Sequence, residues 1–64
     1  MSTRDTIFLS NSEYNEARRK GFITERNRDW VPGDVVDLYG PPYELGLTGT
    51  VTEIEGKQCV IEIW

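Results

Sequence analysis

The chain is 64 residues long, so it is one small domain at most and buries only about 60% of the surface that its unfolded form exposes. Its net charge is −4 and is unevenly spread: residues 1–32 hold six basic and five acidic side chains, whereas residues 33–64 hold one basic and six acidic ones. The second half should therefore repel a phosphate backbone, which argues against nucleic-acid binding there. No apolar run exceeds three residues, so we expect a cytoplasmic protein with neither a membrane span nor a signal peptide.

Residues 1–30 predict an N-terminal arm that carries a short helix. Thr6–Ser10 is either a short strand or an extended part of the arm. The stretch Ser12–Lys20 has its glutamates early and its basic residues late, as the helix dipole favours, and Gly21 is a natural C-terminal stop. The side chains that could cap the first turn are Ser10, Asn11 and Ser12. A helix this short is unstable alone, so we expect it to pack on the sheet or on a partner.

Residues 31–64 carry the stronger signal, that of a small rolled-up antiparallel sheet within the same structural domain. A polar stretch at 24–29 is interpreted as the connector that leads into it. Three β-branched runs then alternate with glycine and proline turns, and Gly56 fits a tight hairpin between the last two. The predicted strands are Val35–Tyr39, Gly49–Glu55 and Gln58–Trp64.

Side-chain parity indicates which face of this sheet is buried. In the last run, Cys59, Ile61 and Ile63 point to one side, which we expect to be the core. Val51 and Ile54 have opposite parity, so both can face inward only if their strand bulges between them. Strong bending of that kind closes a small barrel, and the apolar residues of the second half could fill its core.

Three features occur together in residues 32–63. They are the turn Pro32-Gly33-Asp34, the pair Gly40-Pro41 and the run Thr48-Gly49-Thr50-Val51-Thr52-Glu53-Ile54. Together they resemble the KOW motif of NusG-type transcription elongation factors and of several ribosomal proteins. The resemblance implies a mainly β fold, a small SH3-like antiparallel barrel of five strands, which binds RNA or protein and carries out no catalysis. Gly49 would then mark a sharp bend or a close approach of another strand.

The chain also departs from the motif. The loop at 42–47 is longer than the usual one and lacks the lysines and arginines that RNA-binding members present there. Protein binding is therefore the better expectation for the barrel. The predicted N-terminal helix has no counterpart in the motif.

Candidate catalytic and metal-binding groups are few. Cys59 would need a base to act as a nucleophile, but the chain has no histidine, so we interpret it as a buried structural thiol. As the only cysteine it cannot form an internal disulfide, which favours a reducing setting. Glu53 and Glu55 share a strand face and are interpreted as solvated, because acid–base work would need a cleft. We expect no enzyme activity, no metal and no cofactor.

Aromatic and basic side chains are the candidates for binding. Tryptophan and tyrosine dominate interface hot spots because they bury a large area at low entropy cost. Trp30 and Trp64 could instead plug the ends of the barrel, so their role stays open between core and interface. The acidic side chains of the second half are either a solvated face or a patch that meets a basic protein surface. The predicted binding residues are Tyr39, Tyr43, Leu45, Trp30, Trp64, Arg18, Arg19 and Lys20.

Three functions follow as hypotheses. The first is a non-enzymatic module that contacts a protein. Such a module could act as an accessory or inhibitor protein on the transcription or translation machinery, and its small size is typical of a protein encoded by a phage or other mobile element. The second is a nucleic-acid (RNA)-binding module that uses the basic helix, for which affinity would fall steeply with salt. The third is a small subunit of an enzyme complex, which would co-purify as a large stable assembly.

Overall fold

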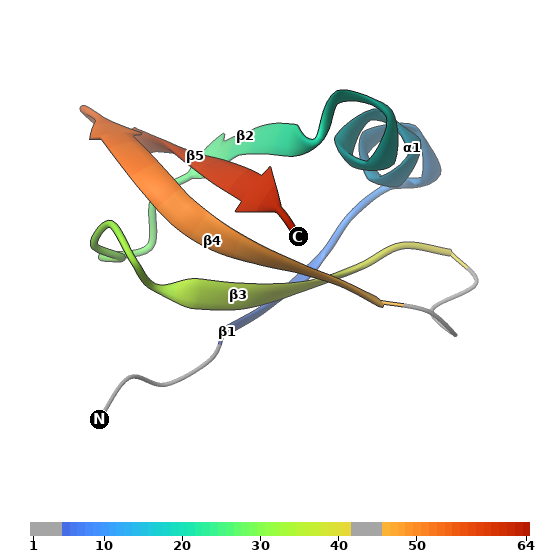
Figure 1. The fold of residues 1–64 in the computed structure, drawn as a ribbon, viewed down its shortest axis with the longest axis horizontal. Coiled ribbons are helices and arrows are strands. Elements are labelled where there is room, and N and C mark those ends of the chain that lie inside the picture. The colour runs from blue at the N-terminus through green and yellow to red at the C-terminus, as the bar shows by residue number, and fades with distance from the viewer. Residues whose placement is uncertain (1–4, 42–45) are drawn as a thin grey trace.

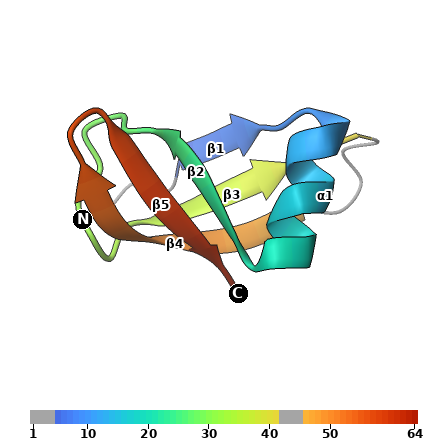
Figure 2. The ribbon, with the colours of Figure 1, turned by 90° about the horizontal axis from the view of Figure 1, so that it is seen from above.

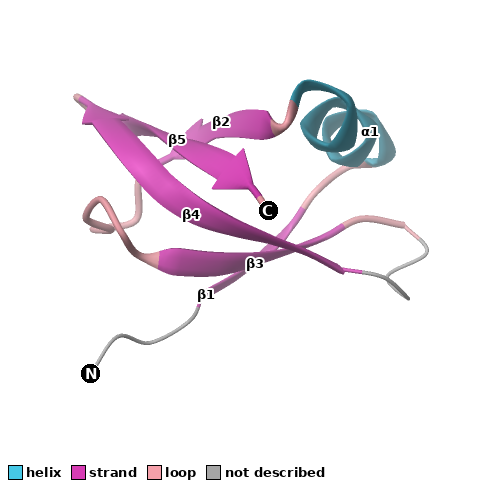
Figure 3. Ribbon diagram, in the orientation of Figure 1, coloured by secondary structure: helices cyan, strands magenta, loops and turns pink. Residues whose placement is uncertain are grey.

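The fold is mainly β, with one short helix near the N-terminus, in a computed structural model that describes residues 5–41 and 46–64. The elements are β1 (Asp5–Phe8), α1 (Asn11–Lys20), β2 (Phe22–Arg26), β3 (Val35–Tyr39), β4 (Gly46–Glu55) and β5 (Gln58–Ile63). The strands form a single five-stranded sheet in the order β1-β3-β4-β5-β2, which curls into a half-barrel (Figures 1 and 3). Among the described residues, no helix is long and apolar enough to cross a membrane.

The sheet is mixed, so the expectation of a fully antiparallel barrel is wrong. β1 runs parallel to β3, with Ile7 opposite Leu38, whereas the other three pairings are antiparallel. Parallel neighbours need a long crossover, and here α1, β2 and the loop at 27–34 supply it. Figure 2 shows β1 and β3 running side by side, with α1 at the end of both strands.

The N-terminal segment contributes both edges of the sheet. β1 overlaps the stretch Thr6–Ser10, which the sequence left open between a short strand and an extended arm, and β2 overlaps the predicted connector at residues 24–26. The error at 24–26 has a simple cause: Ile23 is buried and Glu25 is half-buried, while Thr24 and Arg26 between and after them are exposed. An edge strand with two polar outward residues looks like a polar linker in the sequence.

Helix α1 is delimited by local chemistry. Ser10 is its N-cap in a capping box, in which the Glu13 amide donates to Ser10 Oγ and the Ser10 amide donates to Glu13 Oε1, each at 3.2 Å. Gly21 ends it with φ of 85°, which confirms the predicted stop. Tyr14 and Ala17 are its buried residues. A Cβ at Gly40 would lie 2.5 Å from the Cβ of Tyr14, so the helix packs directly on the backbone beyond β3.

The predicted bulge in β4 is confirmed. The β4–β5 register shifts between Val51 and Glu53, which lets Val51 pair with Ile61 and Ile54 pair with Cys59 on the same inner side. β4 begins at Gly46, three residues earlier than predicted, and β5 ends at Ile63 rather than at Trp64. The hairpin between them turns at Gly56, whose φ is 59°.

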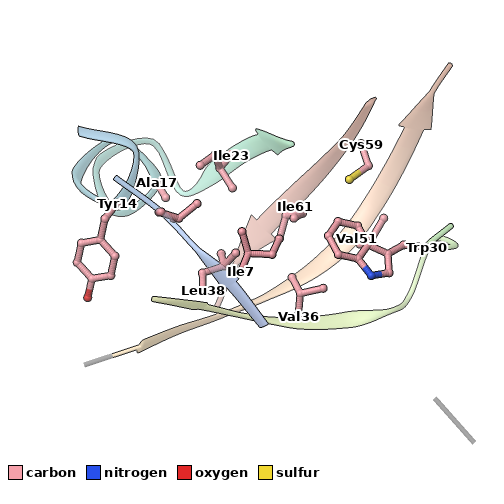
Figure 4. Close-up of a cluster of buried hydrophobic side chains, with 11 residues drawn as sticks. Ile7, Tyr14, Ala17, Ile23, Trp30, Val36, Leu38, Val51, Cys59 and Ile61 are labelled. Carbon is pink, nitrogen blue, oxygen red and sulfur yellow. The ribbon is translucent and has the colours of Figure 1, made fainter. Parts of the chain in front are cut away.

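The core lies inside the curl of the sheet and draws on both halves of the chain (Figure 4). Cys59 and Ile61 are fully buried, as parity predicted, and Ile63 is half-buried against them. The first thirty residues supply more than the sequence indicated, with α1 side chains at one end of the cluster and Trp30 at the other (Figure 4). The buried hydrophobic residues are Ile7, Leu9, Tyr14, Ala17, Ile23, Trp30, Val36, Leu38, Val51, Cys59 and Ile61.

Candidate functional site

The outer face of the sheet carries three exposed aromatic side chains. Strand parity assigns residues to this face: they alternate with the buried positions of the same strands. Phe8 on β1, Phe22 on β2 and Trp64 just after β5 are 70%, 44% and 75% exposed. Phe8 is at one edge of the sheet, whereas Phe22 and Trp64 lie near each other on the neighbouring strands β2 and β5 at the other. Two exposed rings close together on so small a domain point to an interaction surface.

Phe8 and Tyr39 form one pair of rings at the β1 edge. They are opposite each other in the parallel register, and their ring centroids lie 6.2 Å apart. The Tyr39 ring lies over Gly46 on β4, because a Cβ there would meet its Cε1 at 2.6 Å. Tyr39 was predicted as a binding residue and is half-exposed. Tyr43 and Leu45, predicted in the adjoining loop, lie outside the described residues.

Trp64 is exposed but held in position. Its backbone amide donates to the Thr48 carbonyl oxygen at 2.9 Å, which extends the β4–β5 ladder by one residue. Its indole Nε1 donates to Thr50 Oγ1 at 2.5 Å, so the ring lies across β4. A rigid, exposed ring loses little entropy when a partner covers it. The structure therefore places Trp64 on the surface, the alternative that the sequence had left open.

Trp30 is the opposite case and belongs to the core. It is 5% exposed, and its Nε1 donates to Asp5 Oδ2 at 2.7 Å. The loop before it is shaped by Asn27, whose Oδ1 accepts the Trp30 backbone N–H at 2.9 Å, and the Arg28 guanidinium lies 5.9 Å from the ring centre. Of the two roles that the sequence left open for Trp30, the structure shows the core: the ring lies at one end of the buried cluster (Figure 4).

The predicted basic cluster, Arg18, Arg19 and Lys20, is exposed at the end of α1, but two of its three charges form ion pairs within the helix. Arg19 and Lys20 both form ion pairs with Glu16, the latter at 3.3 Å. Lys20, and to a lesser degree Arg19, holds the pKa of Glu16 below its usual range. The Arg18 guanidinium lies 5.9 Å from the centre of the Tyr14 ring. Lys20 alone of the three also lines a hollow on the outer face, beside Phe22.

Among the residues that the structure describes, Cys59 faces Glu25 across the β2–β5 pairing. Cys59 is 1% exposed, and burial, together with the charge of Glu25, raises the pKa of its thiol. Burial and the neighbouring Glu13 raise the pKa of Glu25 as well. Glu53 and Glu55 are exposed on β4, as expected for a solvated strand face. Within the described ranges, no group of three or more histidine, cysteine or acidic side chains could hold a metal ion.

Sequence reasoning missed Phe8 and Phe22. Each stands next to a buried isoleucine, Ile7 and Ile23, so strand alternation could have assigned both rings to the outer face. The missing signal was the assignment of these segments as strands. Comparison of the chain with protein-family models, with curated protein sequences and with solved structures finds no match.

Proposed function

We propose that this chain is a non-enzymatic binding module that contacts a protein partner through the outer face of its curled sheet. The observation that carries the proposal is the exposed and hydrogen-bonded indole of Trp64, with Phe22 exposed on the same face. Ordered aromatic rings on a surface are the groups that anchor protein interfaces. The two hollows that Glu62 lines on this face are open to solvent, which suits a protein surface better than a buried small molecule.

The resemblance to the KOW motif supports the same proposal. In this reading the half-barrel is a variant of the SH3-like barrel, with β1 added in parallel at one edge. Components of the transcription and translation machinery are therefore the first partners to test, and the accessory or inhibitor role expected from the size of the chain remains part of the proposal. The basic cluster is partly paired with Glu16, so no observation favours RNA binding over protein binding.

The proposal is tested by site-specific photo-crosslinking in a lysate of the source organism. A benzophenone side chain is placed at position 24, where Thr24 is exposed on the outer face of β2, or at position 15, where Asn15 is exposed on α1. Both substitutions leave Trp64 and Phe22 in place. We expect one dominant protein adduct from position 24 that excess parent protein competes away, and a much weaker one from position 15. Equal labelling from both positions, or no competable adduct from position 24, would overturn the proposal.

The same preparation also tests the RNA alternative. An RNA adduct that disappears in Arg18→Ala plus Arg19→Ala, and that weakens steeply as salt is raised, would replace protein with nucleic acid as the partner.

A further inference from the structure

Glu62 lies between two aromatic rings on the outer face. In the sheet register its direct neighbours are Phe22 on β2 and Thr50 on β4. Trp64 follows two residues later on the same side, and its hydrogen bond to Thr50 draws the indole toward Glu62. The carboxylate therefore has a ring on each side, one from β2 and one from the end of β5.

The carboxylate of Glu62 is open to a ligand. It makes no ion pair or hydrogen bond with another described residue. The Lys20 ammonium, which lines a hollow together with Glu62, pairs with Glu16 at 3.3 Å. The indole N–H of Trp64 is likewise already used by Thr50. The negative charge is thus presented to solvent beside two apolar walls.

Two shallow hollows meet at this residue. One, of about 330 Å³, is lined by Lys20, Gly21, Phe22, Val60 and Glu62. The other, of about 360 Å³, is lined by Thr50, Thr52, Glu62, Ile63 and Trp64. Because Glu62 is common to both, a side chain that enters either hollow reaches the carboxylate and one of the rings.

The acidic side chains of the outer face favour a ligand with positive charge. Register places the carboxylates of Asp37, Glu53, Glu55 and Glu62 on this side. Among the described strand residues, the same parity places one basic side chain, that of Arg26, on the outer face. A partner that covers this face therefore gains by bringing positive charge, which also steers its approach.

We infer that Glu62, flanked by Phe22 and Trp64, binds an arginine side chain of the protein partner. The planar guanidinium matches both parts of the site, because it forms paired hydrogen bonds with a carboxylate and stacks on an aromatic face. A lysine ammonium could satisfy the charge but not the stacking. This inference rests on the proposed protein-binding function and names the anchor that the partner would supply.

The inference is tested by NMR titration of the whole chain with a short peptide, acetyl-Gly-Arg-Gly-Arg-Gly-amide. Its counterparts carry lysine or uncharged citrulline in place of arginine. We expect dissociation constants in the millimolar range for the arginine peptide, on the order of what one exposed site can supply, with shift changes centred on the Glu62 and Phe22 amides and the Trp64 indole N–H. The lysine peptide should bind several-fold more weakly, and the citrulline peptide should cause no saturable change.

Matched variants distinguish binding at Glu62 from a non-specific effect of the negative charge of the outer face. Glu62→Gln should weaken the arginine peptide at least about fivefold, on the scale of a lost charge-assisted contact. Glu53→Gln makes the same charge change on the same face, opposite Val60 rather than between rings, and should change affinity less than about twofold. Equal weakening by both variants, or equal binding of citrulline, would overturn the inference.

The outcome is distinguishable from failure of the proposed function. If a probe at position 24 captures a partner and Glu62→Gln leaves that capture unchanged, the protein-binding surface stands and the arginine anchor is wrong. If no partner is captured at all, the proposed function itself fails, whatever the peptides do.

Discussion

Gly49 is a residue at which even one added side chain should destabilise the fold. A Cβ there would lie 2.5 Å from Ile61 Cγ2 and 3.1 Å from the backbone oxygen of Glu62, and the first of these side chains is fully buried. Gly49→Val should therefore lower the free energy of unfolding by about 3 kcal/mol, because a buried side chain and a backbone oxygen must both shift to make room. That is a large share of the stability of a domain this size. Thermal melting followed by circular dichroism measures it.

The control for Gly49→Val is a valine at an exposed position of the same strand. Thr52→Val should change stability by less than about 0.5 kcal/mol, because Thr52 is exposed and its hydroxyl makes only a long bond of 3.4 Å to the Val60 oxygen. Arg18→Ala plus Arg19→Ala should likewise leave the domain folded. A Gly49 variant that melts with the parent would contradict the close approach of β4 and β5.

Glu25 makes stability depend on pH. Its pKa is raised in the folded state by burial and by Glu13, so the folded protein resists its ionisation. A raised carboxyl pKa adds stability that is complete below the unfolded value, about 4.3, and is lost as pH rises through the folded value. Glu25→Gln should therefore melt a few degrees higher than the parent at pH 7, and at about the same temperature at pH 3. A lower melting temperature for the variant at pH 7 would show that the charge is stabilising.

At the scale of the element, α1 depends on its N-terminal cap. Ser10 accepts the Glu13 amide, whereas Ser12, two residues later, is exposed within the first turn. Ser10→Ala should cost about 1 kcal/mol, the usual worth of an N-cap, and lower the melting temperature by about 4–8 °C. Ser12→Ala removes the same hydroxyl from the same turn and should cost nothing. If both variants melt alike, the capping box does not stabilise the helix.

Strand β1 shows why the existence of a short strand was harder to predict from the sequence than the position of a helix cap or a turn. Ile7 and Leu9 are buried on either side of exposed Phe8, a clear alternation, yet four residues do not distinguish an arm from a strand. Pairing with β3 makes this segment a strand, and Leu9 extends the pairing through a hydrogen bond of 2.6 Å from its amide to the Tyr39 carbonyl oxygen. Because β3 is distant in the sequence, the residues of β1 alone do not reveal this pairing.

At the scale of the whole molecule, the two tryptophans should behave in opposite ways. Trp30 is buried and hydrogen-bonded to Asp5, so Trp30→Ala should cost about 3–5 kcal/mol and leave little folded protein. Trp64 is exposed, so Trp64→Ala should cost less than about 1 kcal/mol and instead abolish capture of the partner. Denaturant unfolding gives the stabilities, and the crosslinking experiment with the probe at position 24 gives the capture. Normal capture by Trp64→Ala would remove Trp64 from the binding surface.

Taken by itself, the sequence determined what depends on neighbours along the chain. The helix stop at Gly21, the bulge between Val51 and Ile54 and the burial of Cys59 were all predictable, because caps, turns and strand parity act within a few residues. The tertiary structure decided the rest: the parallel place of β1, the burial of Trp30 and the gathering of Phe22, Glu62 and Trp64 on one face. Those outcomes depend on which strands pair, and pairing is set by the free energy of burying the whole core, not by any local pattern.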